Sequence, residues 1–238
     1  MKNFNYYCNL HDTDKGDKGP NGNHYANWYE NWFLSIKDKV NDVCEIGVDN
    51  NSSLLAMADY FPNANFIGLD LLDKSKFNTE RITTQILDQG STEHLNQFIY
   101  DCNFKKLQFD IIIDDGSHDV GHQQSTFGKF FQLIKPGGIY IIEDMGSSYL
   151  VPNISEMYGN IQTQLKSKNN TIDFLNDRPF NSFWISNKDI DYINRNIDYV
   201  SIFDRVNPTC TYSHVYVMKN NYPLRSITSI IKKLNNEK

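Results

Sequence analysis

The sequence predicts an α/β fold built on a doubly wound, mainly parallel sheet. Short β-branched apolar runs alternate with helix-like segments, which is the period of βαβ units. Two of the runs, Ile111-Ile112-Ile113 and Tyr140-Ile141-Ile142, end in the paired carboxylates Asp114-Asp115 and Glu143-Asp144. Continuous apolar runs are typical of parallel strands buried on both faces, and the carboxyl ends of such strands border the crevice where ligands bind. We therefore expect acidic groups to meet at one edge of the sheet.

The individual elements follow from the same periodicity. Parallel strands are predicted at 43–48, 66–70, 83–87, 109–113 and 139–142. Helices are predicted at 53–61, 92–103 and 120–133, the last closed by Lys135-Pro136-Gly137-Gly138. Two further strands, 199–203 and 211–217, are expected to pair antiparallel, because the connection through Asn207-Pro208 leaves no room for a crossover helix. Residues 227–238 are expected to form a helix or a frayed tail.

Composition limits the class of protein. With 238 residues, of which 39% are hydrophobic, the chain can bury one core, and we expect a single domain over 1–238. Residues 1–40 are expected to form a helical cap and residues 147–190 a substrate loop or lid. A net charge of −6 argues against a nucleic-acid partner. The sequence has neither a signal-peptide core nor a run of ~20 apolar residues, so it predicts a cytoplasmic protein without a membrane span.

The two carboxylate pairs predict a site for a hard divalent cation. Asp115, Glu143 and Asp144 are the expected ligands, because an all-oxygen set favours Mg²⁺ or Ca²⁺ over zinc. Asp114 should point to the other face of its strand. The alternative is that these are surface carboxylates that cap the following helices. The cysteines are far apart and include no CxxC pair, which indicates neither a disulfide framework nor a zinc site.

Six short motifs in register carry a resemblance to a known family. They are Glu45-Ile46-Gly47-Val48, Ile67-Gly68-Leu69-Asp70, Leu87-Asp88-Gln89, Asp114-Asp115-Gly116-Ser117-His118, Lys135-Pro136-Gly137-Gly138-Ile139-Tyr140 and Glu143-Asp144. Their order and spacing resemble the class I S-adenosylmethionine (SAM) dependent methyltransferases, and among these the macrolide-sugar O-methyltransferases of the macrocin and mycinamicin type. The resemblance covers roughly residues 13–149, including Thr13-Asp14-Lys15-Gly16, His24-Tyr25 and Tyr29-Glu30. It implies a Rossmann-like, seven-stranded sheet with a C-terminal antiparallel hairpin, SAM and Mg²⁺ as cofactors, and the same three metal ligands.

The expected SAM contacts lie at the ends of the first strands. Gly47 lets the backbone approach the ligand, the next helix begins with free N–H groups for its carboxylate, and Glu45 is expected to receive its ammonium group. Asp70 can accept the ribose hydroxyls, and the missing GxGxxG makes a nicotinamide cofactor less suitable. The resemblance places Asp88 and Gln89 at the adenine, while Asp114 is expected on the cofactor side. The loop 48–53 lacks the family's further glycines, although Asn and Asp tolerate left-handed backbone conformations.

His118 is the expected general base. A sugar hydroxyl is a weak nucleophile at neutral pH, so we expect a cation to lower its pKa and an imidazole to remove the proton. His122 is the alternative, and the remaining histidines, which are less suited to the role, are His11, His24, His94 and His214.

The sequence thus predicts a SAM- and Mg²⁺-dependent O-methyltransferase acting on a sugar hydroxyl. A bias toward Asn, Lys and Ile suggests a bacterial surface or capsular polysaccharide precursor, such as a nucleotide-linked sugar, as the small-molecule substrate. A homo-oligomer is expected, and the aromatic stripe at 25–33 is interpreted as a packing face. The alternatives are another small acceptor (a catechol, an amine or a phosphorylated metabolite), a metal-dependent hydrolase, or a SAM-binding domain without turnover. Tyr149, Tyr158, Arg178, Phe183 and Trp184 of the expected lid could hold a sugar or a phosphate, but the sequence assigns none of them to the acceptor.

Overall fold

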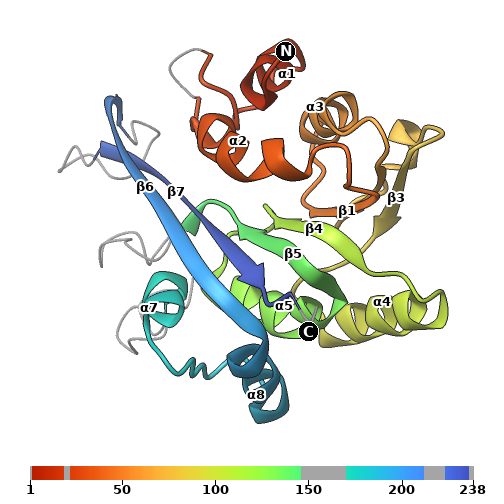
Figure 1. Cartoon of the computed structure of the whole chain (residues 1–238), viewed down its shortest axis with the longest axis vertical. Coiled ribbons are helices and arrows are strands. Elements are labelled where there is room, and N and C mark those ends of the chain that lie inside the picture. The colour runs from red at the N-terminus through yellow and green to blue at the C-terminus, as the bar shows by residue number, and fades with distance from the viewer. Residues whose placement is uncertain (1, 19–21, 146–169, 212–222, 236–238) are drawn as a thin grey trace.

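A seven-stranded sheet forms the centre of the protein (Figure 1), as seen in a computed structural model that describes residues 2–18, 22–145, 170–211 and 223–235. The strand order is β3-β2-β1-β4-β5-β7-β6. The strands are β1 (Asp42–Ile46), β2 (Asn65–Asp70), β3 (Ile82–Ile86), β4 (Phe109–Asp114), β5 (Ile134–Ile142), β6 (Ile197–Thr211) and β7 (Pro223–Lys233). The first five are parallel, and β7 runs antiparallel between β5 and β6. The predicted fold class is therefore confirmed.

Helices cover both faces of this sheet. On one side lie α1 (Phe4–Leu10), α2 (Tyr25–Ile36) and α3 (Ser52–Tyr60), and on the other lie α4 (Thr92–Phe104), α5 (Val120–Phe130), α7 (Thr171–Asn176) and α8 (Asn187–Asn196) (Figure 1). Short 3₁₀ turns occur at Ser75–Phe77 and Phe131–Leu133. None of the helices within the described ranges is long and apolar enough to cross a membrane.

The central strands are apolar throughout because both of their faces are buried. Ile111 and Ile113 of β4 pack into the core beneath α1, α2 and α3, whereas Ile112 packs into the core beneath α4 and α5. Tyr140 and Ile141 of β5 alternate in the same way. This alternation explains the unbroken apolar runs of the sequence and directs successive side chains at the strand ends to opposite faces.

The C-terminal half of the predicted hairpin was wrong. The strand that pairs with β6 is 223–233 and not 211–217, of which residues 212–217 lie outside the described ranges. Asn207 and Pro208 belong to β6 rather than to a turn. The segment expected as a helix or tail is largely strand, because Ile230 and Ile231 fill the two opposite cores beside β5. The prediction of 120–133 as one helix was also inexact, since it ends at Phe130 and a 3₁₀ turn follows. Lys135-Pro136-Gly137-Gly138, expected to close that helix ahead of a strand at 139–142, lies within β5, which begins at Ile134.

The segment expected as a lid is described only from residue 170 onward, so Tyr149 and Tyr158 lie outside the described ranges. Its later part packs on α5, where Thr171 donates to Gln123 and Ser182 donates to Gln124. Trp184 lies against Gly121 in the first turn of that helix.

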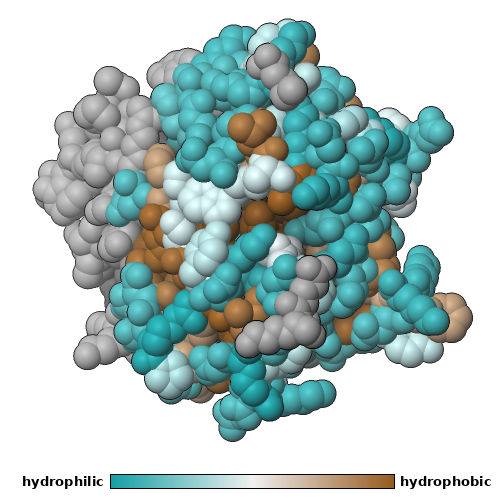
Figure 2. All heavy atoms as spheres, in the orientation of Figure 1, coloured by the Kyte–Doolittle hydropathy of each residue, from teal (hydrophilic) through white to brown (hydrophobic). Residues whose placement is uncertain are grey.

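The face seen in Figure 2 is mainly hydrophilic, with hydrophobic residues showing chiefly near its middle.

Candidate metal and cofactor site

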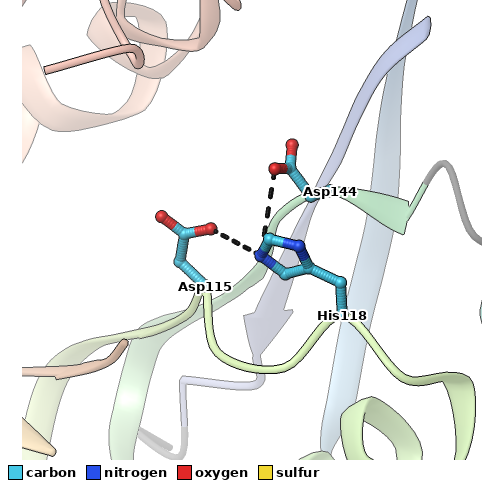
Figure 3. Close-up of side chains that lie close together, drawn as sticks. All are labelled: Asp115, His118 and Asp144. Carbon is cyan, nitrogen blue, oxygen red and sulfur yellow. Dashed lines mark hydrogen bonds and ion pairs between the residues drawn. The ribbon is translucent and has the colours of Figure 1, made fainter. Parts of the chain in front are cut away.

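Asp115, His118 and Asp144 come together at the carboxyl edge of the sheet (Figure 3). Asp115 and His118 lie in the loop between β4 and α5, and Asp144 follows β5. His118 Nε2 is 3.1 Å from Asp115 Oδ1 and 3.8 Å from Asp144 Oδ2. One donor atom from each residue lies within 4.8 Å of the others, and all three side chains are partly exposed. This group could hold a metal ion that a ligand from solution can reach.

Two of these residues have an uncommon backbone conformation. His118 has φ of 57° and Asp144 has φ of 50°, both in the left-handed region that non-glycine residues rarely adopt. Such conformations cost on the order of 1–3 kcal/mol each and persist where the surrounding structure imposes them, commonly at ligand sites. Here they direct an imidazole and a carboxylate toward Asp115 across the strand ends.

Lys15, which was not predicted as a site residue, lies on the buried side of the same carboxylates. Its Nζ is 2.5 Å from Asp115 Oδ2, 2.8 Å from Glu143 Oε2 and 3.5 Å from Glu45 Oε1. Burial of this side chain, which is 1% exposed, favours the neutral amine, but the nearby carboxylates outweigh burial and raise the pKa of Lys15 well above its usual value. The only feature of the sequence that could have indicated a role for Lys15 in the site was its place in the upstream motif Thr13-Asp14-Lys15-Gly16.

Two tyrosines of α2 contact the acidic residues that follow β5. The Tyr25 hydroxyl donates to Asp144 Oδ1 at 2.7 Å, and the Tyr29 hydroxyl donates to Glu143 Oε1 at 2.9 Å. Both rings are buried, so the aromatic stripe is a packing face as predicted, but its hydroxyls have a polar role that periodicity could not show. Both oxygens of Glu143 therefore have partners, and its role as a metal ligand stays a prediction.

Glu45 is a buried carboxylate with one oxygen left unpaired. Its Oε1 accepts a hydrogen bond from Ser53 Oγ at 2.6 Å, whereas its Oε2 has no partner among the described residues. Burial raises the pKa of Glu45 to about 7, although Lys15 acts in the opposite direction. An unpaired buried acceptor is costly, and its cost is removed by a ligand that brings a donor. Glu45 thus fits the ammonium group expected from the sequence.

The loop after β1 is shaped for close approach to a ligand. Gly47 has φ of 88°, and a Cβ at this position would clash with the backbone carbonyl of Asp115. Asp49 and Asn51 also adopt left-handed conformations, with φ of 43° and 73°. The prediction that Asn and Asp can replace the missing glycines of this loop is confirmed.

Asp70 holds this loop in place from the end of β2. Its Oδ2 accepts hydrogen bonds from the N–H groups of Val48 and Asp49, at 3.0 and 3.2 Å. The adjacent Leu72 N–H donates to its Oδ1 at 2.9 Å. The carboxylate therefore organises the β1 loop, and its binding of a ribose stays a prediction.

Asp114 and Gln89 form a buried pair on the other side of the strand end. Gln89 Nε2 donates to Asp114 Oδ1 at 2.7 Å, and Gln89 Oε1 accepts from the Ser117 N–H at 2.9 Å. Burial raises the pKa of Asp114 to about 7. Asp114 and Asp115 thus point apart, as the strand alternation predicts. Asp88 accepts a hydrogen bond from the Gly90 N–H, and cofactor contacts for these positions remain predictions.

The described histidines differ clearly in their surroundings. His122 Nδ1 lies 2.8 Å from Ser117 Oγ, His94 accepts from the Asp88 N–H, and His11 pairs with Asp59. Burial alone would lower the pKa of His118, but its hydrogen bond to Asp115 and the charge of Asp144 raise it to about 9. In the free protein the His118 ring therefore carries a proton at neutral pH. Its role as a base stays a prediction, and His214 lies outside the described ranges.

The chain is similar in sequence to known O-methyltransferases, although it matches no family model. It is 35% identical over 128 residues to the mycinamicin VI 2''-O-methyltransferase of Micromonospora griseorubida, covering 51% of this chain and 31% of that protein. It is 33% identical over 128 residues to the demethylmacrocin O-methyltransferase of Streptomyces fradiae, and this match covers 51% of this chain and 31% of that protein. The match thus spans about a third of the length of these relatives.

A solved structure supports the same relationship at the level of the fold. The structure of the MycE methyltransferase in complex with Mg, SAH and mycinamycin VI superposes with a TM-score of 0.69 and 24% identity, over 100% of this chain and 56% of that one. This chain has the class I SAM-dependent methyltransferase fold. Its sequence is related to the macrolide and deoxysugar O-methyltransferases, as the six motifs predicted. The carboxylate cluster therefore lies at the edge of the sheet where this fold binds its ligands.

Proposed function

We propose that this chain is a SAM- and Mg²⁺-dependent O-methyltransferase that acts on a sugar hydroxyl. The observation that carries the proposal is the unpaired Glu45 Oε2 close to the group Asp115, His118 and Asp144, with Lys15 lying between Glu45 and Asp115. A site for a cationic cofactor and a site for a metal are thus neighbours. The relatives' names as O-methyltransferases, two of them for rhamnosyl compounds, and the Mg and SAH in the MycE structure support this proposal.

The proposed cofactor contacts use groups that the fold already holds in position. Glu45 Oε2 would accept a hydrogen bond from the amino group of SAM, which removes the cost of an unpaired buried oxygen. Gly47 keeps the backbone open beside Asp115, and the first turn of α3 presents N–H groups to the carboxylate. Asp70, at the end of β2, would bind the ribose in addition to fixing the loop.

The metal would be held by the exposed side of the carboxylate cluster. Asp115 Oδ1 and Asp144 Oδ2 both face His118, and two carboxylates plus water or substrate oxygens suit Mg²⁺. A bound divalent cation would orient an acceptor hydroxyl and lower its pKa. A cation bound to Asp115 and Asp144 would offset the negative charge that raises the pKa of His118, so that the neutral ring beside both carboxylates would accept the proton of that hydroxyl, while Tyr25 holds Asp144 in orientation.

The acceptor is proposed to be a glycosylated small molecule. The two relatives described above are named for mycinamicin VI and demethylmacrocin. A third, 34% identical over 128 residues, is a rhamnosyl-tetracenomycin 3'-O-methyltransferase of Streptomyces olivaceus. None of these names refers to a polysaccharide, so the expected capsular or surface polysaccharide has no support from them. Exposed Phe183 and the partly exposed Trp184, next to α5, are the proposed acceptor contacts. The expected homo-oligomer and cytoplasmic location remain predictions.

A mass-spectrometric transfer assay tests this proposal. The chain is incubated with SAM and Mg²⁺ and with a panel of glycosylated natural products and nucleotide-linked sugars. We expect one acceptor to gain a methyl group, and we expect EDTA to abolish the gain. Cleavage of an acceptor without SAM would indicate a hydrolase instead. Retention of SAM without methylation of any sugar, catechol, amine or phosphorylated acceptor would indicate a binding domain without turnover.

A further inference from the structure

Asn51 is a buried polar residue to which the proposed function gives no role. It lies at the N-cap of α3 and is 3% exposed. Its backbone N–H donates to the carbonyl of Val48, but its side-chain Oδ1 has no hydrogen-bond partner among the described residues. A buried acceptor without a donor is costly, and most such groups in folded proteins are paired. Together with Glu45 Oε2, the end of β1 and the start of α3 thus carry two buried oxygens that a ligand with N–H donors can satisfy.

The start of α3 lacks the usual side-chain cap. An asparagine at the N-cap ordinarily has an extended backbone and accepts a hydrogen bond from the second or third N–H group of its helix. Asn51 instead has φ of 73° and makes no such bond. Asn50 Oδ1 accepts from the Ser52 N–H at 3.0 Å. The next two N–H groups, those of Ser53 and Leu54, have no acceptor among the described residues and are available to an anionic group at the positive end of the helix.

An α-amino acid group carries both kinds of charge that this part of the chain can bind. Its ammonium group has three N–H donors, so it can satisfy Asn51 Oδ1 as well as Glu45 Oε2. Its carboxylate can accept from the N–H groups of Ser53 and Leu54. The two halves of the site are joined directly, because Ser53 Oγ donates to Glu45 Oε1 at 2.6 Å.

We propose that Asn51 is a further cofactor-binding residue, a role that rests on the proposed function. Its side-chain carbonyl accepts a hydrogen bond from the ammonium group of SAM, while the carboxylate of SAM takes the place of the missing cap of α3. This role gives a reason for the left-handed conformation of Asn51. A side chain turned to cap the helix would occupy the N–H groups that the carboxylate needs.

The test compares two ligands that differ in the amino acid group. S-Adenosylhomocysteine and 5'-methylthioadenosine are both thioethers of adenosine, and only the first carries an amino acid. In Asn51→Gly we expect titration calorimetry to show S-adenosylhomocysteine binding weakened by about tenfold or more, equivalent to about 1.4 kcal/mol. The affinity for 5'-methylthioadenosine should change by less than about threefold. Glycine adopts φ of 73° readily, so the variant keeps the backbone of the loop.

Asp49→Gly is the matched control. Asp49 lies in the same loop with φ of 43° and its side chain is exposed, so both variants gain the same backbone freedom. Asp49→Gly should bind both ligands within about threefold of the wild type. An equal loss in the two variants, or an equal loss for the two ligands in Asn51→Gly, would show that only the rigidity of the loop matters and would overturn the proposal. Unchanged binding of S-adenosylhomocysteine by Asn51→Gly would overturn it as well.

The proposed function is checked separately on the wild-type protein. If the wild type binds S-adenosylhomocysteine and methylates an acceptor while Asn51→Gly binds S-adenosylhomocysteine as tightly, the role of Asn51 alone is refuted. If the wild type binds neither SAM nor S-adenosylhomocysteine, the proposed function fails and the role of Asn51 fails with it.

Discussion

Replacement of Glu45 by Gln tests the cofactor site most directly. The change keeps the shape of the side chain but removes the charge that would bind the amino group of SAM through Oε2. Hydrogen bonds to charged groups contribute about 1.5–3 kcal/mol. We therefore expect Glu45→Gln to weaken SAM binding about 10- to 150-fold, since about 1.4 kcal/mol corresponds to a factor of ten. Titration calorimetry with SAM measures this change.

The same variant should not destabilise the free protein. Folding raises the pKa of Glu45 from 4.5 to about 7, so the folded protein holds this proton more tightly than the unfolded chain. That contribution to stability is complete below pH 4.5 and is lost as the pH rises through 7. The ionised form thus costs up to about 3 kcal/mol at pH 8. We expect Glu45→Gln to raise the free energy of unfolding at pH 8 and to leave it nearly unchanged below pH 4.5, as urea denaturation can measure.

The pH dependence of SAM binding provides an internal check on Glu45. Because the carboxylate form binds the ammonium group, wild-type affinity should rise between pH 6 and 7.5, and the rise should disappear in Glu45→Gln. The exposed Glu80 lies between β2 and β3, and Glu80→Gln serves as the control that should leave SAM affinity unchanged. SAM affinity within threefold of the wild type in folded Glu45→Gln would refute the assignment.

Five further variants test the rest of the site. Asp115→Asn and Asp144→Asn should each weaken Mg²⁺ binding by about tenfold or more. The affinity of each variant for SAM, measured without metal, should stay nearly unchanged. A Mg²⁺ titration curve equal to that of the wild type would contradict this prediction. His118→Ala should lower the rate of methyl transfer by ~10²–10⁴-fold, and His122→Ala should lower it far less. A larger loss of rate in His122→Ala than in His118→Ala would instead identify His122 as the general base. Gly47→Ala should lower the free energy of unfolding by more than about 1 kcal/mol, because φ at this residue is 88° and the new Cβ would clash with the carbonyl of Asp115. A denaturation midpoint equal to that of the wild type would show that the substitution causes no such strain.

Local pattern was sufficient for most of the sheet but not for its last strand. Strands β1 to β5 were predicted in order, because each contains a short apolar run that a polar or acidic residue follows. The start of β5 was misplaced, since β5 begins at Ile134 and includes Pro136, Gly137 and Gly138, which were expected to precede it. Strand β7 was misplaced. Its residues Ile230 and Ile231 are strand because β5 offers an unpaired edge and two cores to fill, which is information from outside their own segment.

The sequence by itself determined that Asp115 and Asp144 would meet, because parallel strands end at one edge of the sheet and each of these residues follows a strand. It also determined that Asp114 and Asp115 would point apart, since alternation along a strand is a local property. Only the tertiary structure decided which groups hold these acids. Lys15 lies 100 positions from Asp115 in the chain, and Tyr25 lies 119 positions from Asp144. No local period links such distant residues, and their contacts form because α2 and the segment before it pack over the edge of the sheet, where a buried lysine is stable only beside carboxylates.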